Sequence, residues 1–87
     1  MSYFLDFSKK AHNDIEFHKK TGNLPVLKKL DILLNELTEH PFTGTGKPEV
    51  LKHNLNGFWS RRINKEHRLV YKVINDSVQI FSAKGHY

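Results

Sequence analysis

Residues 58–83 read FWSRRINKEHRLVYKVINDSVQIFSA, and this stretch decides the fold of the 87-residue chain. Apolar and polar residues alternate through most of it, and a period of two is typical of β-strands with one buried face. The pattern predicts three strands, at residues 58–63, 67–74 and 77–83. Asn75-Asp76 is a two-residue hairpin signal between the last two strands. We therefore expect consecutive antiparallel strands in this half of the chain.

The turn at residues 64–66 sets how the first two of these strands pair. If it is a three-residue hairpin loop, Ile63 faces His67 and Arg62 faces Arg68. Two arginines directly opposite each other repel, and such a pair is easier to accommodate where an acid or a bound phosphate lies between them. One face then carries Ser60, Arg62, Arg68 and Val70, and is the candidate site. The opposite face is the core face, with Trp59, Ile63, Leu69, Tyr71, Val73, Val78 and Ile80.

Helical signals dominate the first half of the chain. Ser8 is a good N-cap for a helix over residues 9–20, and Gly22 is a good residue to follow its end. Asn23 can cap a second helix, with Pro25 in its first turn, ending near His40 because Pro41 disfavours helical geometry before it. Its leucine stripe comprises Leu27, Leu30, Leu34 and Leu37, widened by Leu24, Val26 and Leu33.

Shorter elements complete the predicted order. Alternation at Tyr3, Leu5 and Phe7 predicts a first strand, residues 41–48 (PFTGTGKP) predict a loop, and residues 51–53 predict a short strand. The order is β-α-α-β-β-β-β. This predicts an α+β fold in which two N-terminal helices pack on one face of a mostly antiparallel sheet.

The composition fits one globular domain spanning residues 1–87, with 38% hydrophobic and 11% aromatic residues. The absence of cysteine excludes disulfides, thiolate catalysis and a cysteine-based zinc site, which suits a reducing cytoplasm. No apolar run is long enough to span a membrane, and the start, MSYFLDFSKK, does not resemble a signal peptide. We therefore expect a cytoplasmic protein without a membrane partner.

The net charge of +5 resides in one part of the chain. Residues 1–46 carry six lysines and six acids, and residues 73–87 carry one of each. Residues 47–72 carry seven basic residues against two acids, which gives +5. A concentrated basic patch attracts polyanions such as nucleic acid.

Each charged residue of this patch has a functional and a structural interpretation. Arg62 and Arg68 could hold a phosphate in a bidentate way, or could belong to an exposed polar sheet face. Lys47 and Lys52 could add point charges or be solvated loop lysines. Glu49 could act as a general base or as a counter-ion for an arginine.

The chain ends in His86-Tyr87. His86 could move protons near neutral pH, or could belong to a frayed terminus, and Tyr87 could stack on a base. The other histidines form no metal motif such as HExxH, so we expect neither a metal site nor a cofactor.

The run PFTGTGKPEVLKHNLNGFWSRRINKEHRLVYKV and the closing HY closely resemble the YoeB (Txe) toxins of bacterial toxin–antitoxin systems, in the RelE superfamily of ribosome-dependent mRNA interferases. The match is dense over residues 41–87, with the signature GKPExLKxNLxGxWSRRIxxEHRLVY. The resemblance implies a RelE-like, microbial-RNase-like fold. It also implies metal-independent cleavage of mRNA in the ribosomal A site by attack of the RNA's own 2′-hydroxyl.

The resemblance also assigns roles to individual residues. It implies that Glu49 is the general base, His86 the general acid and Arg68 the transition-state stabiliser. Arg62 and Lys52 resemble phosphate-contacting residues, Lys47 belongs to the same basic, RNA-binding set, and Tyr87 resembles the tyrosine that orients the RNA. The implied partners are an acidic YefM-like antitoxin, mRNA and the ribosome, and a homodimer is compatible with the family.

One departure bears on His86. Lys84-Gly85 stands where the family has a bulky basic-aromatic pair, and Gly85 adds backbone freedom. Strict alternation would place Gly85 and Tyr87 on the Arg68 face and His86 on the other. The catalytic assignment therefore requires the last strand to end, twist or bulge before His86. A non-catalytic RNA-binding module and a module that binds an acidic protein remain the alternatives.

Overall fold

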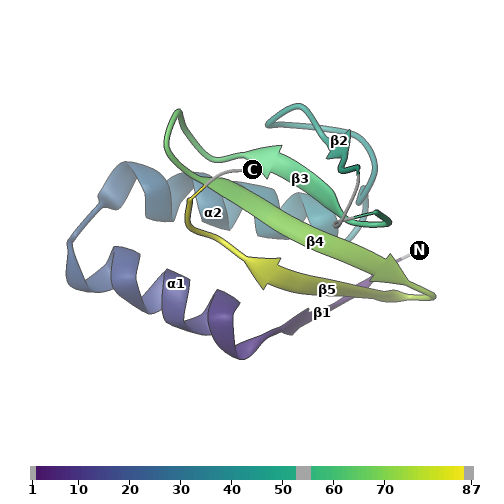
Figure 1. Ribbon diagram of the computed structural model, residues 1–87, viewed down its shortest axis with the longest axis horizontal. Coiled ribbons are helices and arrows are strands. Elements are labelled where there is room, and N and C mark those ends of the chain that lie inside the picture. Colours follow the sequence, from purple (N-terminus) through teal and green to yellow (C-terminus); the bar gives the residue numbers. More distant parts are fainter. Residues whose placement is uncertain (1, 53–55, 86–87) are drawn as a thin grey trace.

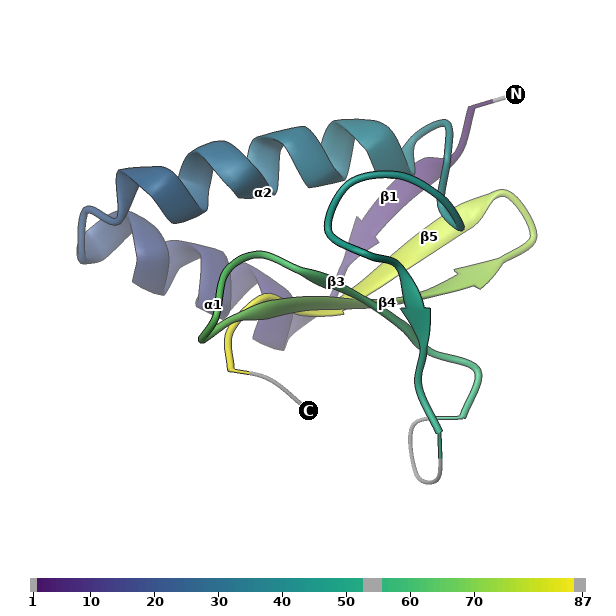
Figure 2. The ribbon, with the colours of Figure 1, turned by 90° about the horizontal axis from the view of Figure 1, so that it is seen from above.

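A five-stranded sheet carries two helices in the computed structural model of the protein, which describes residues 2–52 and 56–85 (Figure 1). The elements follow the predicted order and confirm the α+β fold class. Figure 2 shows α2 running along one face of the sheet. The bounds are β1 Phe4–Phe7, α1 Lys9–Lys20, α2 Leu24–Leu37, β2 Glu49–Val50, β3 Trp59–Arg62, β4 Arg68–Ile74 and β5 Ser77–Ser82.

The strands lie in the order β1-β5-β4-β3-β2, with β1 parallel to β5 and every other pair antiparallel. Arg62 pairs with Arg68, as the three-residue loop predicted. Ile74 pairs with Ser77 across the two-residue turn, where Asn75 has a φ of 55°. Asparagine tolerates this left-handed conformation better than most residues, so the turn prediction is confirmed.

The helix ends follow from their capping residues. The Ala11 amide donates to the Ser8 hydroxyl over 3.0 Å, and Gly22 has a φ of 65° just after α1. Asn23 accepts a hydrogen bond from the Val26 amide over 3.4 Å at the start of α2. These features confirm the predicted helix at residues 9–20, while α2 ends at Leu37, three residues before the predicted end at His40.

Two local predictions were wrong. The apolar stripe of the second helix was predicted to include Leu24, but Leu24 is 68% exposed. The buried face of α2 is centred instead on Val26, Leu30, Leu33 and Leu37. The strand predicted at residues 51–53 lies instead at Glu49–Val50, which pairs with Ser60 and Trp59. Leu51 donates only one further backbone hydrogen bond, to the Phe58 carbonyl over 2.8 Å, and His53 lies outside the described residues.

The core lies between the helices and the predicted core face of the sheet. Ile63, Leu69, Tyr71, Val78 and Ile80 are buried, with Trp59 and Val73 packed against them, so the predicted face is confirmed. The remaining members come from α1, α2 and the end of the chain: Ala11, Val26, Leu30, Leu33, Leu37 and Ala83. No helix in the described part of the chain is long and apolar enough to cross a membrane.

A β-bulge interrupts β5 near its end. Tyr71 pairs with Ile80, but the preceding residue, Val70, pairs with Ser82, so Phe81 is an extra residue. The Ser8 hydroxyl donates to the Phe81 carbonyl over 2.7 Å, which ties the bulge to the start of α1. A bulge shifts the alternation of side chains by one position. Ala83 accordingly lies in the core, where strict alternation would have placed it on the opposite face.

Candidate functional site

The sheet face opposite the core, called here the open face, gathers the charged residues singled out by the sequence. Residues paired directly across neighbouring strands share a face. Glu49 pairs with Ser60, which pairs with Val70, so Glu49 belongs to the open face. Arg62 and Arg68 form the next pair along that face.

The strand spacings give the size of this site. Glu49 and Arg68 are two strands apart and two residues apart along the strands, which is about 9.5 Å by about 7 Å between backbones. Glu49 and Arg62 are exposed and Arg68 is half-buried. Long side chains from these positions can reach one ligand of phosphate size from two sides.

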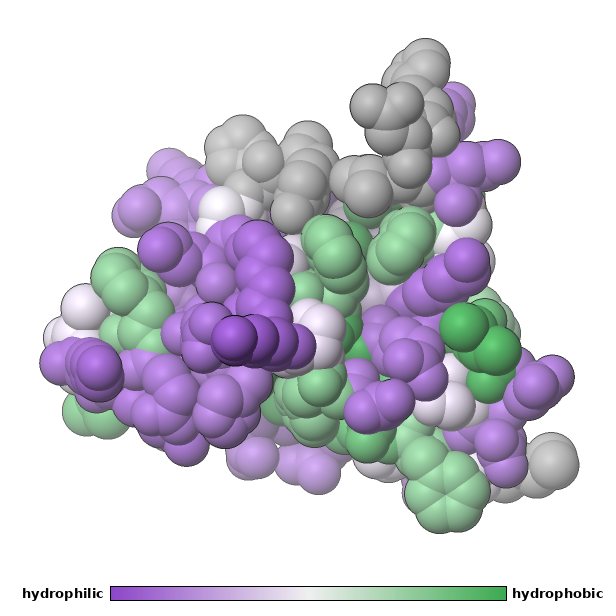
Figure 3. Space-filling view, turned by 60° about the horizontal axis from the view of Figure 1, so that its bottom comes forward, coloured by the Kyte–Doolittle hydropathy of each residue, from purple (hydrophilic) through white to green (hydrophobic). Residues whose placement is uncertain are grey.

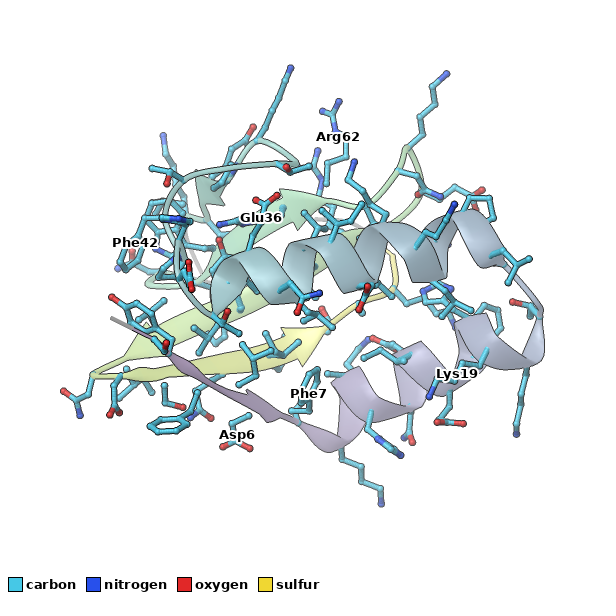
Figure 4. The ribbon with its side chains drawn as sticks, turned by 180° about the vertical axis from the view of Figure 1, so that it is seen from behind. Asp6, Phe7, Lys19, Glu36, Phe42 and Arg62 are labelled. Atoms are coloured by element: carbon cyan, nitrogen blue, oxygen red, sulfur yellow. The ribbon has the colours of Figure 1, made fainter. Side chains whose placement is uncertain are left out.

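The two predicted lysines lie at the edges of this face. Lys52 is exposed just after β2. Lys47 has a φ of 53° and lines a pocket of about 460 Å³ together with Lys29, Arg62 and Lys65. Figure 4 shows the Arg62 side chain at the edge of the molecule, extending away from α2. Lys29 was missed by the sequence analysis because the charges of the first 46 residues sum to zero, and only the packing of α2 brings it here.

Arg61, the neighbour of Arg62, is a structural residue. It is fully buried, and its guanidinium contacts the side chains of Tyr71 and Glu36 at 3.1 and 3.0 Å. It also donates to the backbone carbonyls of the loop that leads to β2, those of His40, Thr43 and Thr45. Of the seven basic residues in residues 47–72, Arg61 therefore belongs to the protein interior and does not add to the basic surface patch.

The pKa values of two side chains that contact Arg61, Glu36 and Tyr71, are shifted in this arrangement. Hydrogen bonds from Thr45, with help from Arg61, hold the pKa of Glu36 below its usual value despite partial burial. Burial raises the pKa of Tyr71, and Arg61 opposes that shift. The Tyr71 hydroxyl donates to the Pro41 carbonyl over 2.7 Å. Figure 4 shows Glu36 beneath the loop. The buried Arg61 guanidinium contacts both Glu36 and the loop carbonyls, so it holds the loop that leads to Glu49.

Gly46 completes the connection between this loop and the arginine pair. Its carbonyl accepts a hydrogen bond from the Arg62 amide over 2.7 Å. Its φ is 84°, and a Cβ there would lie 2.8 Å from the Arg62 carbonyl oxygen. Only glycine fits this close approach, which explains the glycine of the GKPE motif in physical terms.

The chain that leads to His86 is held on two sides. On the α1 side, the Ala83 amide donates to Asp14 over 3.0 Å and its carbonyl accepts from His18 Nε2 at 2.9 Å. On the β4 side, the Gly85 amide donates to His67 Nδ1 over 3.0 Å, and the Gly85 carbonyl accepts from the Arg68 amide over 2.8 Å. Gly85 therefore lies beside Arg68.

These contacts fix the tautomers of both histidines. His67 accepts at Nδ1 and His18 donates from Nε2, so each neutral ring carries its proton on Nε2. Their ring centroids are 4.8 Å apart, and His18 Nδ1 is buried without a hydrogen-bond partner among the described residues. Burial lowers the pKa of His67, with further lowering by His18 and Lys84, while Glu66 and Asp14 oppose the shift. The lowered pKa of His67 favours the neutral state of that ring.

The bulge at Phe81 meets the condition that the sequence analysis placed on His86. Alternation is shifted by one before the strand ends at Ser82. Both His86 and Tyr87 lie outside the described residues. Within residues 2–52 and 56–85, no group of three or more histidine, aspartate or glutamate side chains could hold a metal ion.

Comparisons with known proteins agree in sequence and in structure. A family model described as YoeB-like toxin of bacterial type II toxin-antitoxin system matches residues 7–87. Toxin YoeB of Escherichia coli K12 is 46% identical over 83 residues, covering 95% of this chain and 98% of that protein. The chain is also similar to two solved structures from Staphylococcus aureus. One is a YoeB dimer (TM-score 0.87) and the other is a heterotetrameric YoeB-YefM toxin-antitoxin complex (TM-score 0.85). In both cases the identity is 40%, and the match covers 100% of this chain and 100% of the other.

Proposed function

Because the chain belongs to the family of YoeB-like toxins of bacterial type II toxin–antitoxin systems, we propose that it is a ribosome-dependent mRNA endoribonuclease. In this proposal it blocks translation by cutting mRNA in the ribosomal A site. The observation that carries the proposal is the shared open face of Glu49, Arg62 and Arg68, where the strand register places one acid and two arginines on three neighbouring strands.

The reaction begins at the ribose. Glu49 accepts the proton of the 2′-hydroxyl, and the resulting oxygen attacks the adjacent phosphorus. Negative charge develops on the phosphate oxygens, where the guanidinium of Arg68, assisted by Arg62 and Lys52, stabilises it. The protein's cations thereby supply the charge stabilisation that this step needs.

The second half of the reaction breaks the bond from phosphorus to the 5′-oxygen. His86 donates a proton to that leaving oxygen, which yields a 2′,3′-cyclic phosphate and a free 5′-hydroxyl, while Tyr87 orients the RNA. The bulge at Phe81 and the hydrogen bonds of Gly85 to His67 and Arg68 support this role, because they bring the preceding residue beside Arg68.

Cleavage of mRNA on programmed ribosomes tests this function. Wild type should produce fragments ending in 2′,3′-cyclic phosphate, and an mRNA with 2′-deoxyribose at the cleaved nucleotide should resist. Glu49→Gln should be strongly impaired, while Glu39→Gln, an exposed acid after α2, is the matched control. Salt-sensitive RNA binding by the wild type without any cleavage would instead identify a non-catalytic RNA-binding module.

The same proposal includes partners. We infer pairing with an acidic YefM-like antitoxin, supported by the net charge of +5 and by the YoeB-YefM complex of the Staphylococcus aureus relative. The dimer of that relative supports a homodimer in this protein as well. Expression of the chain alone should arrest bacterial translation, and co-expression of an acidic product of a neighbouring gene should relieve the arrest. Growth unaffected by the chain, with binding to an acidic protein only, would favour a pure interaction domain.

A further inference from the structure

The open face continues beyond its cationic end into an aromatic pocket. Phe58, Lys72 and Phe81 meet there: the two phenyl centroids are 5.5 Å apart, and Lys72 Nζ lies 5.4 Å from the centre of the Phe58 ring. The pocket has a volume of about 300 Å³, and its walls also include Asp6, Phe7, Ser8, Ile74, Gln79 and Ile80. Figure 3 shows apolar atoms between hydrophilic side chains on this side of the molecule.

Chemically, the pocket suits a nucleobase. Two half-buried phenyl rings offer apolar faces on which any base can stack. Gln79 pairs with both Lys72 and Asp6, so an amide, an ammonium and a carboxylate lie in one row across the sheet. Such groups can contact the polar edge of a base or the phosphate attached to it.

The position of the pocket relative to the arginine pair suits one continuous RNA strand. On β4 the open face carries Arg68, Val70 and Lys72 in turn, a span of about 13 Å. Val70 lies between the two cations on this face and carries no charge, and it is fully buried together with its cross-strand neighbours Ser60 and Ser82. An RNA whose cleaved phosphate lies at Arg68 reaches the pocket with a neighbouring nucleotide.

We propose that Phe58, Lys72 and Phe81 form a base-binding subsite for a nucleotide next to the cleaved bond in single-stranded RNA. The inference rests on the proposed endoribonuclease function and adds a substrate contact to it. Lys72 and the adjoining arginines favour a polyanion on this face, and the paired phenyl rings favour a base over an acidic peptide.

Single-turnover cleavage on programmed ribosomes tests the subsite with a coupling cycle. The protein variants are Phe58→Leu and Phe81→Leu, which keep apolar volume but remove the stacking ring, and Lys72→Gln, which removes the charge beside the Phe58 ring. The RNA variants carry one abasic nucleotide at each position of the cleaved codon and its neighbours. Phe4→Leu is the matched control, because Phe4 is 71% exposed outside the pocket.

Loss of stacking corresponds to about a 5- to 150-fold weakening. We expect the wild type to lose this much at one abasic position, Phe81→Leu to lose as much on intact RNA, and the two changes together to cost little more than either alone. Phe4→Leu should behave as wild type. Fully additive losses, or pocket variants that cleave intact RNA as well as wild type, would overturn the subsite. So would variants that weaken binding of an acidic antitoxin alone.

A fluorescence measurement separates the subsite from the catalytic proposal. With 2-aminopurine at the sensitive position of ribosome-bound mRNA, stacking quenches emission whether or not the RNA is cut. Quenching by wild type but not by Phe81→Leu, without any cleavage, would reject the endoribonuclease function and retain the base contact. Equal emission with both proteins would reject the base contact, even if cleavage occurs.

Discussion

The amide of Gly85 donates a hydrogen bond to Nδ1 of His67 over 3.0 Å. The next residue, Arg68, begins β4 and donates its own amide to the Gly85 carbonyl over 2.8 Å. Two consecutive residues at the start of β4 thus hold both backbone groups of the residue that precedes His86. In the proposed mechanism, this contact fixes where the chain bearing the general acid begins.

Replacement of the His67 acceptor should therefore slow cleavage. His67→Leu removes one hydrogen bond, worth about 1 kcal/mol, so we expect the single-turnover rate to fall by roughly fivefold to tenfold. His67→Asn, whose side-chain oxygen can accept the same amide, should recover most of the rate. Equal rates for wild type and His67→Leu would show that the contact does not support the reaction.

Stability should depend on pH through the same imidazole. The pKa of His67 is lowered from 6.5 in the folded protein, mainly by burial, so the unfolded chain binds the proton more tightly. The stabilising effect of the neutral ring is fully present above the unfolded pKa and is lost as pH falls through the folded pKa. Urea unfolding between pH 7.5 and about 4.5 should show this loss in wild type and a shallower slope in His67→Asn. The same dependence of stability on pH in wild type and His67→Asn would contradict the assignment of this loss to His67.

Substitution of Arg61 should mainly reduce the stability of the fold, whereas substitution of the adjacent Arg62 should mainly reduce cleavage. Arg61→Met removes the guanidinium that donates to three loop carbonyls and to Glu36, and should destabilise the fold by about 2–4 kcal/mol. Arg62→Met changes an exposed side chain, so stability should change by no more than about 0.5 kcal/mol while cleavage falls. Thermal unfolding and single-turnover cleavage of both variants measure the contrast. The reverse pattern would mean that the two roles are exchanged.

The basic pocket beside Arg62 should contribute to salt-dependent ribosome binding. Neutralising Lys29, Lys47 or Lys65 removes one of the cations that line this pocket. Each substitution by glutamine should make the slope of log affinity against log salt shallower by roughly 0.7 to 0.9. Ribosome sedimentation across a potassium chloride series measures this, with Lys9→Gln on α1 as the control. A slope unchanged in all three variants would exclude the pocket from the contact.

Much of the fold could be predicted because local signals agree with one another. Ser8, Gly22 and Asn23 cap the helices where their chemistry favours it, and alternation after residue 58 specifies which face is buried. The Arg62–Arg68 pair followed from the length of one turn. These features depend on residues close together in the sequence.

Features that depend on distant residues could not be predicted. The bulge at Phe81 is held by Ser8, 73 residues away, and nothing within β5 signals it. Arg61 is adjacent to Arg62 and of the same residue type, but its carbonyl partners come together only after the loop folds over it. Lys29 joins the basic pocket through helix packing alone. Tertiary contacts therefore decided which cations serve the interior and which face a ligand.

Single-turnover cleavage of ribosome-bound mRNA by wild type, Glu49→Gln and His86→Ala tests the central claim most directly. General acid and base groups typically contribute about 10²–10⁴ to a rate, so each variant should lose roughly a hundredfold or more. Antitoxin binding and thermal unfolding should stay near wild type, which separates a chemical defect from a folding defect. Equal cleavage by wild type and His86→Ala would contradict the assigned mechanism.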